Sequence, residues 1–179
     1  KIGTVKRQDI LENQVNYAYL ALGSNLGKKI KNLEFAKYKL TKIGINIVKS
    51  SSFYITKSWP YTKFPEFVNS VIFIKTTLLL PDLFIQIKLI EKSLGRTKSP
   101  KNYPRICDID IIDFNGKILS IKFNSQKIDI PHLDMHKRNF VLMPLYEINQ
   151  NWVHPKSKKN IVKLLSALPS NDLRSIKFD

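Results

Sequence analysis

The chain of 179 residues is poor in cysteine, in acidic residues and in long uninterrupted apolar runs. Its single cysteine, Cys107, excludes an internal disulfide and is expected to be a small buried hydrophobic side chain. The first residues are basic, but no apolar stretch follows them, so we expect no signal peptide. The longest apolar run, residues 78–90, is interrupted by proline and polar residues and cannot span a bilayer. These absences indicate a soluble cytoplasmic protein without membrane contact.

Acidic residues number only 14 against 30 lysines and arginines, which gives a net charge of +16. Such a balance is typical of proteins that bind nucleic acid, anionic membranes or phosphorylated substrates. Most of the basic residues are lysines scattered along the whole chain, and we interpret them as a solvated surface. The few arginines are more informative, because Arg96 and Arg105 lie just before the most distinctive segment of the chain.

That segment is 105–116, which is rich in β-branched and apolar residues and ends in an Asn-Gly turn signal. Side chains alternate along a strand, so Asp108 and Asp110 should share one face, with Asp113 on the other. Two neighbouring carboxylates repel each other unless a cation lies between them, and Mg²⁺ suits such oxygen ligands. Together with the basic residues at 96–105, the pair predicts a metal–polyphosphate site. A structural ion-pair network is the alternative.

Hydrophobic periodicity predicts the order strand, helix, strand, strand, helix, strand over residues 17–22, 30–43, 45–56, 67–76, 81–94 and 105–114. This order is typical of a ferredoxin-like α+β fold, an antiparallel sheet with helices on one face. A returning edge strand is expected at 117–123, and helices at 140–148 and 161–168. We expect one domain over residues 17–179 after an N-terminal extension of residues 1–16.

Two further patterns have competing interpretations. Residues 23–29 lie between a strand and a helix, but the glycine spacing of a phosphate-binding loop is missing, so a turn with a helix entry is expected. Phe67 and Asn69 share a strand face, where they could stack a flat heterocycle and bond its edge, or simply belong to core and sheet edge. The histidines at 132, 136 and 154 lack the context of a metal cluster.

Five segments, taken together, resemble the 6-hydroxymethyl-7,8-dihydropterin pyrophosphokinase family: residues 22–27, 51–56, 65–71, 104–112 and 131–140. The resemblance covers about residues 17–155. It implies a ferredoxin-like fold and a Mg²⁺-dependent enzyme of folate biosynthesis. This enzyme would transfer pyrophosphate from ATP to the pterin's hydroxymethyl oxygen and release AMP. Small-molecule substrates, a monomeric state and no nucleic-acid partner are expected. The alternative is an RNA-binding ferredoxin-like module, but the chain lacks that module's Gly- and aromatic-rich strand motif.

By this resemblance, Asp108 and Asp110 would bind a pair of Mg²⁺ ions, and Arg96 and Arg105 would act with them in catalysis by neutralising phosphate charge. The residues implied in ATP binding are Lys98, Ile111 (through its backbone), His132 and Arg138. Those implied in pterin binding are Thr56, Trp59, Phe67, Asn69 and Phe140. The loop 96–104 would close over ATP. It departs from the family pattern at Asn102-Tyr103, where the family has an aromatic residue and then glycine, so either residue could take the aromatic's place.

Overall fold

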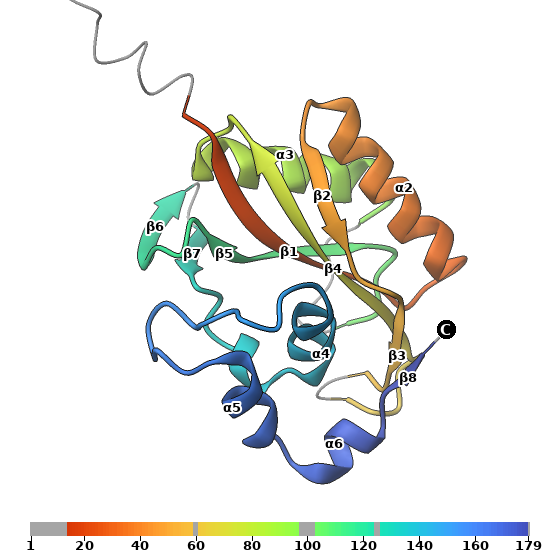
Figure 1. Cartoon of the computed structure of the whole chain (residues 1–179). Helices are drawn as coiled ribbons and strands as arrows, with labels where there is room; N and C mark the ends of the chain where they lie inside the picture. The colour runs from red at the N-terminus through yellow and green to blue at the C-terminus, as the bar shows by residue number, and fades with distance from the viewer. Residues whose placement is uncertain (1–13, 59–60, 97–102, 124–125, 179) are drawn as a thin grey trace, which may run out of the picture.

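The computed structural model of the chain describes residues 14–58, 61–96, 103–123 and 126–178. Its centre is a six-stranded sheet in the order β5-β1-β4-β3-β8, with β2 also paired to β4 (Figure 1). Every pairing among these strands is antiparallel. The strands are β1 (Asn16–Ser24), β2 (Asn46–Ser50), β3 (Tyr54–Thr56), β4 (Phe67–Thr76), β5 (Asp108–Phe114) and β8 (Lys177–Phe178). The predicted α+β class with an antiparallel sheet is confirmed.

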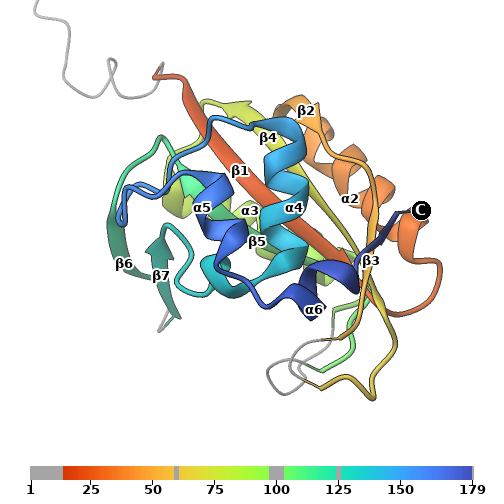
Figure 2. The ribbon, with the colours of Figure 1, turned by 60° about the horizontal axis from the view of Figure 1, so that its bottom comes forward.

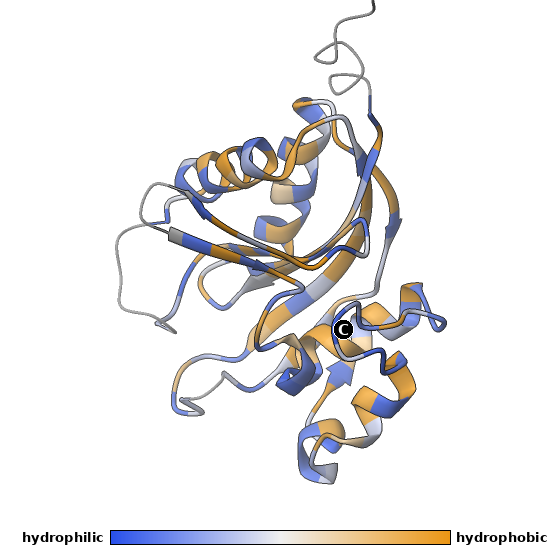
Figure 3. Cartoon of the chain, turned by 90° about the vertical axis from the view of Figure 1, so that its left-hand side faces the viewer, coloured by the Kyte–Doolittle hydropathy of each residue, from blue (hydrophilic) through white to orange (hydrophobic). Residues whose placement is uncertain are grey.

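Helices cover both faces of this sheet, so the expectation of helices on one face is wrong. Figure 2 shows α4 (Asn139–Ile148) and α5 (Ile161–Ser166) in front of the sheet, with α2 (Lys29–Lys42) and α3 (Leu80–Ser93) behind it. The cause is that the central strands are apolar on both sides. Leu20 and Ile72 face the α2–α3 core, whereas Val71 belongs to a second core with α4 and α5. Figure 3 shows hydrophobic residues (orange) along the central strands and in the helices on both sides of the sheet.

The long strand expected over residues 45–56 is divided into β2 and β3, because the residues between them make other hydrogen bonds. The Ser51 hydroxyl accepts from the backbone N–H of Val71, and the Ser52 N–H donates to the Glu147 carboxylate on α4 at 3.0 Å. A backbone N–H satisfied by a side chain no longer extends a strand ladder.

The segment 117–123 does not return along the edge of the main sheet. Its strand, β6 (Leu119–Phe123), pairs instead with β7 (Gln126–Ile130) in a separate two-stranded sheet. Strand β7 was not predicted, and neither were the short α6 (Ser170–Arg174) and β8, since these polar segments carry little periodicity. A short 3-10 helix, Met135–Lys137, precedes α4.

A β-bulge changes the side on which Asp113 lies. The register between β1 and β5 shifts between Tyr19 and Leu20, so that Asp113 lies opposite Tyr19, on the α4 side of the sheet. There the indole N–H of Trp152 donates to Asp113 Oδ2 at 2.9 Å, and burial raises the pKa of the Asp113 carboxyl. The prediction that Asp113 faces away from Asp110 is therefore wrong. Asp113 still lies outside the cavity described next.

Candidate active site

Small residues on β1 leave space at the centre of the α4 side of the sheet. Gly23 lies between Asn69 on β4 and Asp108 on β5, and Ala21 lies between Val71 and Asp110. A Cβ atom added at Gly23 would lie 3.2 Å from Asn69 Oδ1 and 3.4 Å from a Phe67 ring carbon. Among the glycines that the structure describes, Gly23 is the one without a positive φ, so the lack of a side chain is what matters here.

This space is a cavity of about 270 Å³ between the sheet and the start of α4. It is large enough for part of a small-molecule ligand. Its lining contains three aspartates, five lysine and arginine side chains, and an aromatic–amide group: Ala21, Leu22, Gly23, Thr56, Lys57, Phe67, Asn69, Lys88, Arg96, Arg105, Asp108, Asp110, His132, Asp134, Arg138, Phe140 and Val141.

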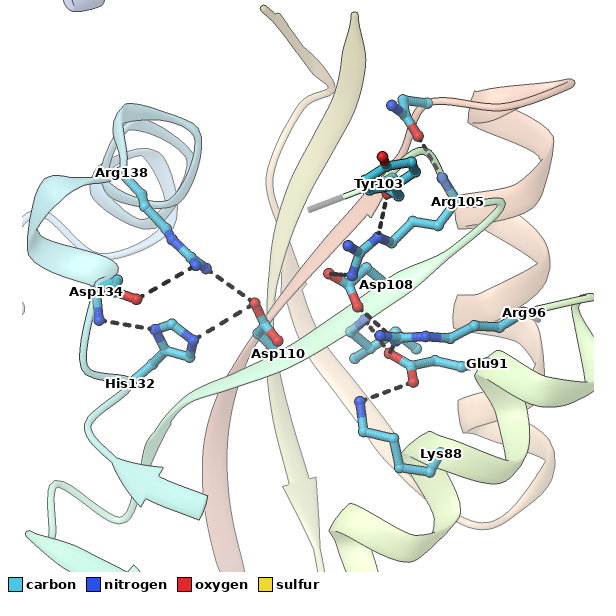
Figure 4. Close-up of polar contacts among 12 residues, drawn as sticks. Lys88, Glu91, Arg96, Tyr103, Arg105, Asp108, Asp110, His132, Asp134 and Arg138 are labelled. Atoms are coloured by element: carbon cyan, nitrogen blue, oxygen red, sulfur yellow. Dashed lines mark hydrogen bonds and ion pairs between the residues drawn. The ribbon is translucent and has the colours of Figure 1, made fainter. Parts of the chain in front are cut away.

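Asp108 is held between two arginines (Figure 4). Arg96 Nη1 donates to its Oδ1 at 2.6 Å, and Arg105 Nη1 donates to its Oδ2 at 3.0 Å. Burial opposes ionisation of this carboxyl, but the two guanidinium groups outweigh it and hold the pKa of Asp108 below its ordinary value. Asp108 is thus an ionised carboxylate whose side chain is still 25% exposed to the cavity.

Asp110 has a different set of partners, which come from the segment before α4. Arg138 Nη1 donates to Asp110 Oδ2 at 3.2 Å, and His132 Nε2 lies 3.8 Å from the same oxygen. His132 Nδ1 accepts from the Asp134 backbone N–H, so the neutral ring carries its proton on Nε2, facing Asp110. Burial lowers the pKa of His132 despite the nearby carboxylates, which favours this neutral form.

Asn69, Thr56 and two phenylalanines form the opposite end of the cavity. The Asn69 amide Nδ2 donates to Thr56 Oγ1 at 2.9 Å and to the Tyr54 carbonyl at 3.4 Å. Its Oδ1 is therefore left as the acceptor on the Gly23 side, where the Phe67 ring also lies. The Phe140 ring lines the same cavity from α4. The predicted aromatic–amide pair faces a cavity and is not a core-and-edge pair.

The turn after β1 fixes Arg105. The Arg105 N–H donates to Asn25 Oδ1 at 2.7 Å, and the Asn25 N–H donates to the Arg105 carbonyl at 3.2 Å. Asn32 Nδ2 also donates to the Ile106 carbonyl at 3.3 Å. The segment at 23–29 is thus a strand end and a turn, which holds the entry to β5 in place and does so without the geometry of a phosphate-binding loop.

Sequence reasoning missed Glu91, a buried carboxylate on α3 that contacts Arg96. It also missed Gly23, Lys57, Lys88 and Asp134 as cavity-lining residues. A signal for Glu91 was available: it follows Ile87 by four positions and so lies on the apolar face of the helix. A charged residue on such a face is rarely buried without partners.

Most of the predicted site residues come together in this one cavity. They are Thr56, Phe67, Asn69, Arg96, Arg105, Asp108, Asp110, His132, Arg138 and Phe140. Ile111 is not among them: its side chain belongs to the α2–α3 core, and its backbone lies on the edge strand β5. Trp59, Lys98 and Asn102 lie outside the described residues. Tyr103 packs its ring against Phe64 and does not line the cavity.

The fold is α+β, and its cavity brings carboxylates and guanidinium groups together with aromatic rings. The sequence matches the 7,8-dihydro-6-hydroxymethylpterin-pyrophosphokinase (HPPK) family over residues 19–150. The chain belongs to this family, and the resemblance seen in its motifs is confirmed. The family and several relatives are named for pyrophosphokinase activity, and other relatives for folic acid synthesis.

Relatives and solved structures agree. The chain is 35% identical to the 2-amino-4-hydroxy-6-hydroxymethyldihydropteridine pyrophosphokinase of Aquifex aeolicus, over 87% of this chain and 92% of that protein. It is 34% identical to the folic acid synthesis protein fol1 of Pneumocystis carinii, of which it spans only 22%. A Plasmodium falciparum HPPK-DHPS structure with pterin and p-hydroxybenzoate has a TM-score of 0.75 at 17% identity, covering 96% of this chain and 49% of that chain. The last comparison shows the fold alone.

Within the described part of the chain, no helix has the length and apolar character of a membrane span.

Proposed function

We propose that this chain transfers a pyrophosphoryl group from ATP to 6-hydroxymethyl-7,8-dihydropterin and releases AMP. The observation that carries the proposal is the cavity itself, in which two aspartates from one strand face lie beside an aromatic–amide slot. A structural ion-pair network would explain the aspartates and arginines, but it would not explain the space that Gly23 and Ala21 leave open between them and the slot.

At the phosphate end, Arg96, Arg105 and Arg138 supply the positive charge. Phosphoryl-type transfer depends mainly on alignment and on stabilisation of charge spread over the phosphate oxygens. Planar guanidinium groups suit this role because they donate two parallel hydrogen bonds to phosphate. Arg105 is fixed through Asn25, and Arg138 lies at the start of α4, so two rigid elements bring these cations to one cavity.

The aspartates fit a site for Mg²⁺. Both are partly exposed to the cavity, Asp108 by 25% and Asp110 by 32%, and they project from alternate positions of one rigid strand. Mg²⁺ binds through one or two carboxylates together with water and substrate phosphates, so two protein ligands suffice. We propose that Asp108 and Asp110 hold such ions. The chemistry supplied by bound Mg²⁺ is neutralisation and orientation of the ATP phosphates.

At the other end, Phe67 and Phe140 would hold the pterin ring while Asn69 reads its edge. Because Thr56 and the Tyr54 carbonyl occupy the Asn69 amide N–H groups, the free Oδ1 offers an acceptor to a ring N–H or amino group. The slot and the aspartates lie in one cavity, so the pterin's hydroxymethyl group could approach the phosphates directly. Holding reactants in this way supplies much of the rate gain in two-substrate reactions.

The test is a nucleotide product analysis. The protein is incubated with ATP, Mg²⁺ and 6-hydroxymethyl-7,8-dihydropterin, and the nucleotides are separated. We expect AMP that depends on the pterin and on Mg²⁺, with a pyrophosphorylated pterin in equal amount. The matched control is Asp110→Asn, which keeps the size of the side chain and removes its charge, and which should abolish turnover. ADP as product, or no turnover with intact folding, would refute the proposal.

We further propose that the enzyme works as a cytoplasmic monomer on these small substrates, with no nucleic-acid partner. The free, buried Cys107 is compatible with a reducing compartment. Sedimentation velocity and salt-dependent RNA binding test this: a dimer, or tight RNA binding at physiological salt, would contradict it.

A further inference from the structure

Glu91 is the most deeply buried carboxylate beside the cavity, with a side chain that is 1% exposed. It lies on α3 and receives three contacts. Lys88 Nζ lies 2.8 Å from Oε2, Arg96 Nη1 lies 2.5 Å from Oε1, and the Ile109 backbone N–H donates to Oε1 at 2.8 Å (Figure 4). The proposed reaction assigns no role to this residue.

These three contacts all come from donors, so the carboxyl group serves only as an acceptor. A protonated carboxyl would point its proton at a cation or at a backbone N–H, which makes the ionised form the one that fits. Lys88 provides a second counter-charge, and its amino group also lies 5.3 Å from the centre of the Phe84 ring. Burial raises the pKa of the Glu91 carboxyl, and the Lys88 and Arg96 cations oppose that rise. Glu91 is thus a buried carboxylate with partners on α3, on β5 and at Arg96.

The same Arg96 nitrogen contacts both Glu91 Oε1 and Asp108 Oδ1. Arg96 lies three residues beyond Ser93, the last residue of α3. Its N–H donates to the Glu91 carbonyl, which adds a second link between the two residues. If Asp108 takes other partners when substrates bind, Glu91 is the acid that keeps the guanidinium at the cavity.

We propose that Glu91 is a positioning residue, which fixes Arg96 and the start of strand β5 for pyrophosphoryl transfer. The inference rests on the proposed function and adds to it a residue that touches no substrate. Glu91 acts on the reaction through Arg96. Its hydrogen bond to Ile109 acts on the strand that carries both aspartates. Removing its charge should misplace a phosphate-binding guanidinium without altering the pterin slot.

The test is a double-mutant cycle between Glu91→Gln and Arg96→Ala. Glu91→Gln keeps an oxygen for the Ile109 N–H and loses the charge. We expect it to lower kcat and ATP affinity, with kcat falling about 10- to 100-fold, the range found when supporting contacts of a site are lost. The KM for the pterin should not change. In the Arg96→Ala background, Glu91→Gln should cause no further loss, because residues that act as a unit are not additive.

The matched control is Glu34→Gln. Glu34 also pairs with a lysine three positions away on a helix, at 3.0 Å from Lys37, but its side chain is exposed and does not line the cavity. This variant should keep full activity. Melting curves establish that each variant is folded. Glu91→Asp, a methylene shorter, enters the same cycle if Glu91→Gln is not recovered folded.

ATP affinity, measured by titration calorimetry, gives the cycle a readout that does not need turnover. Additive losses in both kcat and ATP affinity would overturn the inference, as would an unchanged kcat in Glu91→Gln. If the wild-type protein is active but the losses are additive, only the positioning role fails. If the wild-type protein forms no AMP, the proposed function fails, while non-additive ATP affinities would still support the link between Glu91 and Arg96.

Discussion

Gly23→Ala tests the idea that missing side-chain volume, and not backbone flexibility, makes the pterin slot. The added methyl group would lie 3.2 Å from Asn69 Oδ1 and 3.4 Å from the Phe67 ring, in the space between the amide and Asp108. Forcing an extra methyl into a fitted site costs about 1–3 kcal/mol. At about 1.4 kcal/mol for each factor of ten, pterin affinity should fall about 5- to 150-fold.

The stability of the folded protein should not fall together with the pterin affinity. Gly23 has ordinary extended φ and lies inside a strand, where glycine costs roughly 0.5–1 kcal/mol relative to alanine. Alanine regains about 0.5–1 kcal/mol of stability in the free protein. Small shifts of the Asn69 and Phe67 side chains relieve the close contacts with the added methyl group. We therefore expect a melting temperature close to that of the wild type together with weaker pterin binding.

Calorimetric titration with the pterin substrate measures the first effect, and titration with ATP provides an internal control that should not change. Gly116→Ala is the matched variant. Gly116 has φ +62° in the turn after β5, with nothing within 4 Å of the added Cβ, so it should lose stability and keep pterin affinity. Unchanged pterin affinity in Gly23→Ala, with native melting, would refute the reasoning.

Three further outcomes are expected. Trp152→Phe removes the indole donor to the buried Asp113 and should lower the free energy of unfolding by about 1–3 kcal/mol in urea titrations, with kcat unchanged; a lower kcat would contradict the separation of Asp113 from the site. Burial opposes ionisation of Asp108, but Arg105 and Arg96 hold its pKa below the ordinary 3.8. Its contribution to stability is therefore present above that pH and lost as the pH falls through the lower pKa of the folded protein, so Asp108→Asn should reduce the loss of stability in acid below the ordinary pKa. Burial raises the pKa of the Cys107 thiol to about 12, so a thiol reagent should modify it only when denaturant is added; rapid labelling of the native protein would argue against the burial of this side chain.

Local pattern was enough to predict β1, β4 and β5, together with the faces of β4 and of most of β5. Alternation placed Phe67 and Asn69 on one face and Ile72 on the other, because a half-buried strand repeats every two residues. Likewise Cys107, which directly precedes β5, is buried in the α2–α3 core, while the next residue, Asp108, lines the cavity on the other side of the sheet. These features depend only on near neighbours in the chain, which is why a single sequence reveals them.

Features set by distant partners could not be predicted in this way. The bulge at Asp113 arises from pairing with β1 and leaves no mark in its own segment, so alternation failed there. The interruption at Ser52 depends on Glu147, which lies 95 positions away. Gly23 was taken for part of a turn, since its role is visible only when Asn69 and Asp108 flank it in the sheet.

The second layer of helices could have been foreseen in part. Val71 and Phe73 are apolar on the face of β4 opposite Ile72, and α4 buries Val141 and Leu142. A sheet that is apolar on both sides needs cover on both sides. Helices were expected at 140–148 and 161–168, where α4 and α5 lie, but the ferredoxin-like element order includes only α2 and α3, so the other two helices were not assigned to a face of the sheet.

The arginine–aspartate pairs at the cavity also bear on how substrate is gained and product released. In the free protein, Arg96 and Arg105 hold Asp108, and Arg138 holds Asp110. Binding of a metal-bound nucleotide would then be a partner exchange, in which carboxylates pass to the metal and guanidinium groups to phosphate. Breaking the internal pairs reduces the net affinity, and their re-formation favours departure of the products. Re-formation of the ion pairs would speed product release, which matters in an enzyme that binds polyanions through several charges.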